Sequence, residues 1–174
     1  FKAGAVVLAG GTFWRAMTYR GRQATPAGRV GEPPSNLISL SLAGLGHTIG
    51  RLSTCTAPRL KAGTVDLSRL EEQPGLDSVR PFSALHDSVR NLTSCWLTWT
   101  NPETHRIVES GLHDSIFYCG DAPGAAPRFC PSIADKIHHY PQRERHPVFL
   151  APDCQGVIFP RGILTWLDPP VQAA

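Results

Sequence analysis

Residues 5–13 read AVVLAGGTF, a continuous apolar run with two glycines near its end. A run of this length without polar alternation is typical of a parallel strand that is covered on both faces. Gly10 and Gly11 would lie at its carboxyl end, where open α/β sheets bind ligands and where glycine lets the backbone approach them closely. The stretch predicts an α/β fold. Taken alone, its glycines are explained more simply by an ordinary turn after a buried strand.

The composition sets limits on the class of protein. The chain has 174 residues, enough for one domain with a sizeable core, and a net charge of +3. This mild charge permits contact with a polyanion but does not require it. No apolar run is long enough to span a bilayer, and no signal peptide is indicated. Because the chain begins without Met and almost inside an apolar strand, we expect it to be a fragment of a longer protein.

The cysteines are odd in number and widely spaced, with no C-x-x-C pair. This spacing indicates neither a zinc site nor a disulfide framework, so no metal site is predicted. Reduced thiols in a cytosol-like compartment are the simplest explanation. The five positions are Cys55, Cys95, Cys119, Cys130 and Cys154.

Local patterns predict most of the secondary structure. Ser35 is expected to cap a helix formed by SNLISLSLAGLG, and Gly44 or Gly46 is expected to end it. Alternation predicts a strand in CWLTWTN, and ETHRIVESGL predicts a short amphipathic helix with Ile107 and Val108 facing inward. The remaining predictions are an extended segment at 47–60 and a pair of strands at 147–152 and 156–164.

A reactive cysteine is indicated by APRFCPSIADKIHHY, residues 126–140. Pro131 suits the first position of a helix, which would make Cys130 its N-cap. A thiolate there would be stabilised by the helix dipole, and by Arg128 and Lys136 if their side chains point toward it. The same amides could instead hold a cofactor phosphate. A small buried side chain at a helix start remains the commoner role for a lone cysteine.

Several dispersed motifs resemble one family in the same order along the chain. APRFCPSIADK resembles the family sequence GPRYCPSIEDK, and AGRVGEPPS resembles GGRAGEPPS. GRLSTCTAPRL is similar to GRLKTGTPPRI, CWLTWTNPETH to CYITHTNEKTH, and IFPRGILTWL to IYPNGISTSL. The family is MnmG, also called GidA, whose members modify tRNA uridine with a 5-carboxymethylaminomethyl group.

The resemblance implies an α/β fold: part of an FAD-binding domain of the glutathione-reductase type, with an inserted mixed α+β region that binds NADH. Residues 1–60 would belong to the FAD-binding domain, 61–124 to the insertion, and 125–174 to the nicotinamide-binding segment and the return to the first domain. Family members use FAD, NADH and methylene-tetrahydrofolate, act with an MnmE-type GTPase on the wobble uridine (U34) of tRNA, and form homodimers. A cytoplasmic enzyme is expected, or a mitochondrial one in a eukaryote.

The resemblance also assigns roles to residues. Cys130 falls on a proposed catalytic cysteine, whose thiolate could add to C6 of uracil or whose thiol could donate a proton. Ser35 falls on a flavin-contacting serine, and Gly10 and Gly11 are expected beside the cofactor. The segment assigned to nicotinamide-dinucleotide binding comprises Ala126, Pro127, Arg128, Phe129, Cys130, Pro131, Ser132, Ile133, Ala134, Asp135, Lys136, Ile137, His138, His139 and Tyr140.

Departures from the family motifs keep alternatives open. Ala134 replaces a glutamate, Ser53 a lysine and Cys55 a glycine. We expect the 174-residue chain by itself to be inactive and to bind FAD weakly or not at all, because half of the flavin site lies outside it. One alternative is the folate- and FAD-dependent tRNA uridine-54 methyltransferase, which shares the fold. Another is a degenerate module that binds a nucleotide or a protein partner without catalysis.

Overall fold

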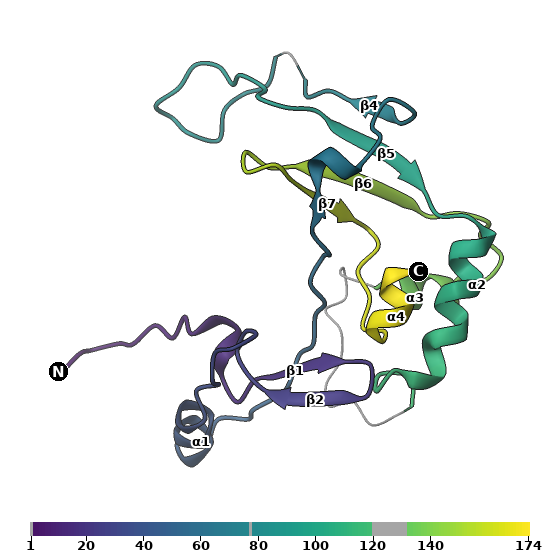
Figure 1. Ribbon diagram of the computed structural model, residues 1–174. Helices are drawn as coiled ribbons and strands as arrows, with labels where there is room; N and C mark the ends of the chain where they lie inside the picture. The colour runs from purple at the N-terminus through teal and green to yellow at the C-terminus, as the bar shows by residue number, and fades with distance from the viewer. Residues whose placement is uncertain (1, 77, 120–131) are drawn as a thin grey trace.

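The computed structural model describes residues 2–76, 78–119 and 132–174 and shows a mixed α/β protein with two lobes (Figure 1). The lower lobe is formed by the first part of the chain. It contains η1 (Gly11–Phe13), the hairpin of β1 (Met17–Arg20) and β2 (Gln23–Pro26), and α1 (Leu37–Gly44). An extended segment then crosses to the upper lobe, in agreement with the prediction for residues 47–60.

The upper lobe is built on one antiparallel sheet, with the strand order β3-β7-β6-β5-β4 among the described residues. Its central strand, β6, pairs with β7, which confirms the strand pair predicted near the end of the chain. The strands are β3 (Leu60–Lys61), β4 (Glu71–Gln73), β5 (Cys95–Trp99), β6 (Pro147–Pro152) and β7 (Val157–Arg161), and η2 (Ala62–Thr64) follows β3.

Short helices lie between this sheet and the lower lobe. They are α2 (Pro102–Gly111), η3 (Leu112–Asp114), α3 (Ile133–His139) and α4 (Pro169–Ala173). The strand predicted in CWLTWTN and the helix predicted after it are confirmed by β5 and α2. Asn101 caps α2 by accepting a hydrogen bond from the Thr104 amide at 2.8 Å, and Pro102 occupies the first turn.

The buried parallel strand predicted at residues 5–13 is wrong. Residues 5–9 have no regular secondary structure, and the side chains of Val6 and Val7 are 76% and 91% exposed. The sheets of the described residues are antiparallel, and no strand among those residues pairs with this run. An apolar run forms a buried strand only where a neighbour satisfies its backbone groups, and no such neighbour is present in the described part of the chain.

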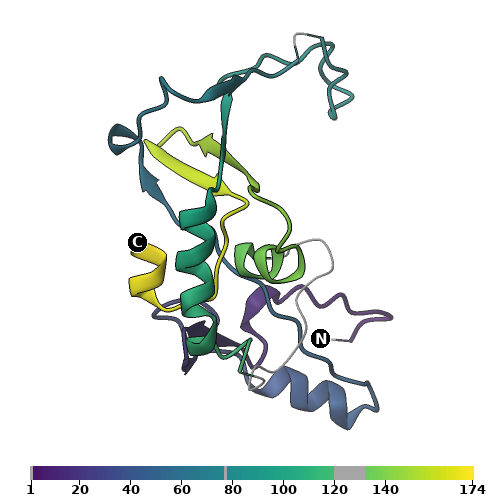
Figure 2. The ribbon, with the colours of Figure 1, turned by 90° about the vertical axis from the view of Figure 1, so that its right-hand side faces the viewer.

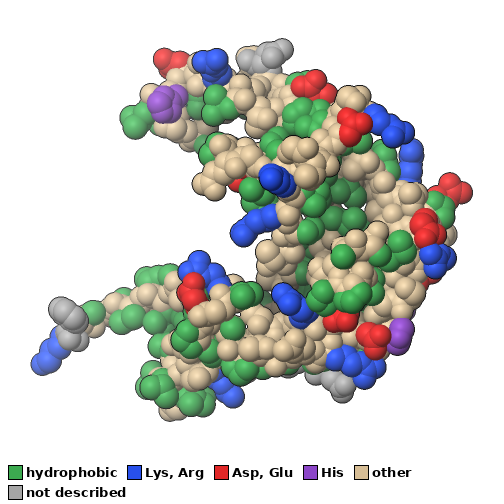
Figure 3. Space-filling model, in the orientation of Figure 1, with side chains coloured by type: hydrophobic (Ala, Val, Ile, Leu, Met, Phe, Trp, Pro, Cys, Tyr) green, Lys and Arg blue, Asp and Glu red, His purple; other side chains and the backbone are tan. Residues whose placement is uncertain are grey.

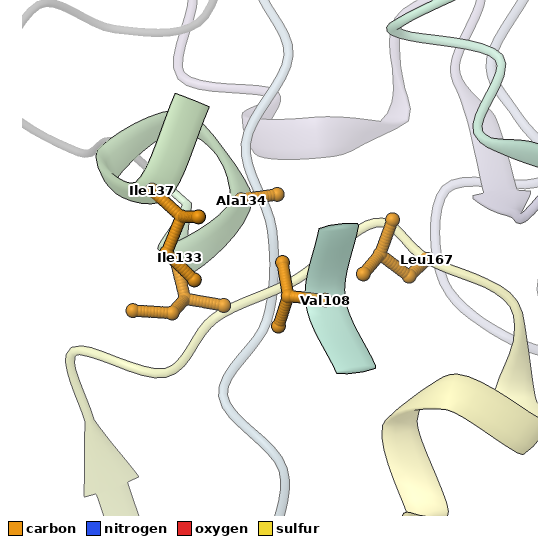
Figure 4. Close-up of a cluster of buried hydrophobic side chains, with 5 residues drawn as sticks. All are labelled: Val108, Ile133, Ala134, Ile137 and Leu167. Atoms are coloured by element: carbon orange, nitrogen blue, oxygen red, sulfur yellow. The ribbon is translucent and has the colours of Figure 1, made fainter. Parts of the chain in front are cut away.

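The first hydrophobic core joins the helices. Figure 2 shows α2 and α3 side by side, with α4 on the other side of α2. Val108 from α2 packs among side chains of α3 and of the segment before α4, and the prediction that it faces inward is confirmed. The cluster consists of Val108, Ile133, Ala134, Ile137 and Leu167 (Figure 4).

The second core lies under one face of the five-stranded sheet. Val148, Leu150 and Ile158 are its buried members, and Trp96 packs against them. Ile163, which follows β7, packs against both cores. Its position makes the strand-to-helix connection part of the packing of each layer.

The hairpin of the lower lobe is held by the segment after η3. The Ile116 amide donates to the Gly21 carbonyl at 3.4 Å, and the rings of Tyr19 and Phe117 meet edge to face at 5.4 Å. Figure 3 shows a hollow between the two lobes, with Lys and Arg side chains along its edges. Within the described residues, the helices are all too short or too polar to cross a membrane.

Candidate functional site

The start of α3 carries a reciprocal hydrogen-bond pair. The Ser132 hydroxyl accepts from the Asp135 amide at 3.0 Å, and the Asp135 carboxylate accepts from the Ser132 amide at 2.9 Å. The amides of Ser132 and Asp135, at the helix start where backbone acceptors are lacking, both gain a side-chain acceptor in this way. A short helix of this kind depends on such bonds more than a long one does.

The predicted start of this helix is therefore wrong by two residues. Ser132, not Cys130, is the N-cap, and the helix begins at Ile133 rather than at Pro131. A serine oxygen accepts an amide hydrogen bond better than sulfur does, and Asp135 stands three residues later to complete the pair. Residues 126–131, including Cys130, lie outside the described residues.

The side chains of α3 fall into two groups. Ile133, Ala134 and Ile137 are buried and face the helix core. His138, His139 and Tyr140, at the other end of the helix, are exposed. The predicted nicotinamide-binding segment thus contributes both anchoring and exposed side chains. Between the groups, the Lys136 ammonium donates to the Gly162 carbonyl at 3.2 Å.

Tyr118 is a member of this site that the sequence analysis missed. Its hydroxyl donates to the second oxygen of the Asp135 carboxylate at 2.7 Å, and its ring lies 5.8 Å from the ring of His138. Burial raises the pKa of Tyr118, and the hydrogen bond to Asp135 raises it further. The phenol therefore stays protonated and orders the carboxylate. Nothing in the local sequence distinguishes this tyrosine from an ordinary core residue.

Substitution of Ser132 by alanine tests the importance of the cap. We expect Ser132→Ala to lower the free energy of unfolding by about 1 kcal/mol, because the Asp135 amide loses its acceptor and the Asp135 carboxylate loses the Ser132 hydroxyl as a donor. Urea denaturation followed by far-UV circular dichroism measures this difference. The matched control is Ser35→Ala, since the Ser35 hydroxyl caps no helix. Equal losses in the two variants would contradict a specific role of the cap.

The residues predicted to contact flavin meet in the lower lobe. The Ser35 amide donates to the Phe13 carbonyl at 2.7 Å, and the Arg15 amide donates to the Ser35 carbonyl at 2.9 Å. These bonds place Ser35 beside the turn that contains Gly11, whose φ is +59°. A Cβ on Gly10 would lie 1.7 Å from the Trp14 indole nitrogen, so the indole packs where a side chain would stand. The prediction that Ser35 caps α1 is wrong, because the N-cap is Asn36.

Two histidines, the half-buried His105 and the buried His146, lie where β5, α2 and the approach to β6 meet. The Thr100 hydroxyl accepts from the His146 amide at 2.8 Å and lies 2.8 Å from Nε2 of His105. The two imidazole rings are 5.5 Å apart, and His146 is only 3% exposed. Its Nε2 has no hydrogen-bond partner among the described residues. Burial lowers the pKa of His146, and positive charge on His105, Lys136 and Arg143 lowers it further.

This histidine gives a pH dependence of stability. The ordinary pKa of histidine is 6.5, and the folded protein holds His146 below that value. We expect the free energy of unfolding to fall as the pH drops from above 6.5 through the lower folded-state value, because the unfolded chain binds the proton more tightly. Urea denaturation across this pH range measures the slope.

The variant His146→Gln should lose part of that slope, since the glutamine does not titrate. His113→Gln is the matched control, because the His113 side chain is 73% exposed. Parallel loss of stability with falling pH in the wild-type and His146→Gln proteins would show that His146 is not responsible.

No group of three or more His, Cys, Asp and Glu side chains that could hold a metal ion occurs in residues 2–76, 78–119 and 132–174. Of the cysteines in those ranges, those at positions 95, 119 and 154 are free thiols. The groups present at α3 and around Ser35 are hydrogen-bonding side chains, exposed rings and backbone amides. Such groups are suited to binding an organic cofactor or a base.

Comparisons with known proteins place the chain among relatives that are much longer. The sequence model of a family described as "Glucose inhibited division protein A" matches residues 1–174. The chain is 44% identical over 172 residues to a protein of Syntrophotalea carbinolica named "tRNA uridine 5-carboxymethylaminomethyl modification enzyme MnmG", covering 97% of this chain and 28% of that protein. A Thermus thermophilus protein of the same name is 40% identical, with 98% and 29% covered.

Solved structures of Aquifex aeolicus GidA are similar in fold. The form I crystal structure matches with a TM-score of 0.80 and 36% identity, covering 93% of this chain and 29% of that one. The form II structure gives a TM-score of 0.78 and 34% identity, with 93% and 27% covered. The chain thus spans less than a third of the length of these relatives.

Proposed function

Because the chain belongs to the glucose inhibited division protein A family, we propose that it serves in a tRNA uridine 5-carboxymethylaminomethyl modification enzyme. Such an enzyme would add a carboxymethylaminomethyl or aminomethyl group to C5 of the wobble uridine. The observation that carries the proposal is the match over residues 1–174, at 44% identity to a protein with that name. The mixed α/β fold is consistent with it.

The cofactors of this proposal are FAD, NADH and methylene-tetrahydrofolate. Ser35 and the Gly10–Gly11 turn would hold the flavin, since Ser35 is exposed and a Cβ on Gly11 would meet open space. The exposed end of α3 would contact nicotinamide dinucleotide through His138, His139 and Tyr140. When bound, reduced flavin would be central to the chemistry at the base. The glutathione-reductase type of FAD domain, with residues 1–60 in it and 61–124 inserted, is part of the same proposal.

The chain's own residues would act on the base and on the cofactor segment. We assign to Cys130 either addition of its thiolate to C6 of uracil, which makes C5 nucleophilic, or proton donation to the base. Asp135, held by Ser132 and Tyr118, would fix the helix that follows this cysteine. An MnmE-type GTPase and tRNA would be the partners of the homodimeric complete protein in the cytoplasm.

Nucleoside analysis tests the proposal. The complete gene product that contains this chain would be expressed in a bacterial strain that lacks its own MnmG, and the tRNA nucleosides would be measured by mass spectrometry. We expect the modified wobble uridine to return. A strain that lacks the uridine-54 methyltransferase, carrying the same gene, is the control. Return of 5-methyluridine in the control, without restoration at the wobble position, would support the methyltransferase instead.

One observation favours a binding module without catalysis. Ala134 is fully buried in the helix core, at the position where the family motif has a glutamate. This chain therefore lacks a carboxylate there that could orient its neighbours. A complete protein that binds the cofactors but leaves wobble uridine unmodified would support this second function.

A further inference from the structure

The five-stranded sheet has one buried face and one face open to solvent. Side chains alternate between faces along a strand, so the neighbours of buried Val148, Leu150 and Ile158 point the other way. Strand register places Leu97 opposite Phe149, and Phe149 opposite Arg161. We call this open side the outer sheet face; it is formed by Leu97, Trp99, Phe149, Phe159 and Arg161.

Aromatic rings on the outer sheet face are accessible. Trp99 and Phe149 are each 42% exposed, although large aromatic side chains are usually buried much further. They lie on adjacent strands, with Trp99 opposite Pro147. Neighbouring strands are about 5 Å apart, which leaves flat apolar surfaces side by side across the sheet. Such a surface offers stacking to planar groups.

Arginines accompany these rings. The Arg145 guanidinium lies 4.3 Å from the centre of the Trp99 ring, and the Arg59 guanidinium lies 5.7 Å from the centre of the Phe159 ring. Arg161 adds a third positive charge on β7, and Lys61 on β3 adds a fourth at the sheet edge. Glu71 on β4 lies on the same side of the sheet, and its carboxylate accepts a hydrogen bond from Gln73. Positive charge therefore predominates.

The combination limits the kind of partner. Binding of an apolar protein surface would remove water from several guanidinium groups. This desolvation costs free energy unless acidic groups of the partner pair with the guanidinium groups. An acidic peptide would pair with the arginines but would leave the exposed rings unused. Single-stranded nucleic acid supplies both bases that stack on aromatic rings and phosphates that pair with arginine.

We propose that the outer sheet face binds single-stranded RNA, such as a tRNA loop, with bases stacked on Trp99 and Phe149 and phosphates on Arg59, Arg145 and Arg161. The choice of RNA rests on the proposed function, whereas the stacking and charge follow from the face itself. This surface belongs to the sheet and is distinct from Ser35 and α3. It would hold RNA near the site rather than take part in chemistry.

Fluorescence anisotropy of the 174-residue chain with a labelled single-stranded RNA of anticodon-loop sequence tests the proposal. We expect Trp99→Ala to weaken binding by about ten-fold or more, because stacking on an aromatic ring is lost. Trp99→Phe keeps a ring and should retain most of the affinity. Arg145→Gln should reduce the slope of log affinity against log salt by about 0.7, the value for one phosphate contact on a single strand.

Matched controls lie away from this face. Phe82→Ala removes an exposed aromatic ring in the β4–β5 connection, and Arg106→Gln removes an exposed arginine on α2. Both should bind RNA as the wild type does. Circular dichroism verifies the fold of each variant, and Phe149→Leu repeats the test on another strand.

Unchanged RNA affinity in folded Trp99→Ala and Phe149→Leu would overturn the proposal. So would displacement of the RNA by polyglutamate as readily as by unlabelled RNA, which would indicate charge alone. A change of oligomeric state without a change in RNA affinity would identify a protein interface instead. A different result would count against the proposed function alone: the complete protein would leave wobble uridine unmodified, while RNA binding would still depend on Trp99.

Discussion

Replacing Ile133 with alanine is expected to lower the free energy of unfolding by about 2–5 kcal/mol. Ile133 is 1% exposed and packs at the centre of the core that joins α2, α3 and the segment before α4. Truncation removes buried methyl and methylene groups and leaves a cavity in the helix core. Chemical denaturation, monitored by circular dichroism, measures the change.

The chain provides a control with the same chemistry at an exposed position. Ile49 is 46% exposed in the connection between the lobes, so Ile49→Ala should change stability by no more than about 0.5 kcal/mol. If the two variants lost the same stability, the helix core would not be a main source of folding energy.

Replacing Cys130 with serine in the complete protein is expected to reduce wobble-uridine modification by at least about 100-fold. A hydroxyl has a much higher pKa than a thiol, so serine neither forms the anion that adds to C6 of uracil nor replaces the thiol as a proton donor. Mass spectrometry of tRNA nucleosides from the complemented strain measures the loss.

Cys154→Ser is the matched control, because Cys154 is an exposed free thiol between β6 and β7. That variant should modify tRNA at the wild-type level. Full activity of Cys130→Ser would remove Cys130 from the mechanism and would favour a role in binding only. The flavin content of the purified variants separates loss of chemistry from loss of the cofactor.

The sequence patterns predicted elements best where local chemistry and tertiary packing agree. In CWLTWTN, alternation gives β5 a buried face and an open one, and Asn101 with Pro102 starts α2 in the next turn. The strands around Phe149 and Phe159 follow the same rule. The strands that pair with these elements lie within the described residues. The alternation of apolar and polar residues in the sequence therefore matches the buried and open faces of the sheet.

Predictions failed where the deciding partner is not visible locally. AVVLAGGTF has the composition of a buried strand, but Val7 is almost fully exposed because no neighbour among the described residues covers it. The predicted start of α3 is wrong because the side chains of Ser132 and Asp135, rather than Pro131, decide where this helix begins. Backbone hydrogen bonds join the segments of Ser35 and Phe13, which follows Gly11 in the same turn, although the flavin role predicted for Ser35 and Gly11 stays a prediction. Cys130 lies outside the described residues, and its role stays a prediction.

The side chain of Ile163 packs against both the sheet core and the helix core. Two layers that share such a residue do not open independently, since exposing one removes contacts from the other. Amide protons in β6 and in α2 should therefore exchange with solvent through one common opening event, with similar protection. The upper lobe would then behave as a single cooperative unit, and the outer sheet face would keep its shape whenever α3 is in place.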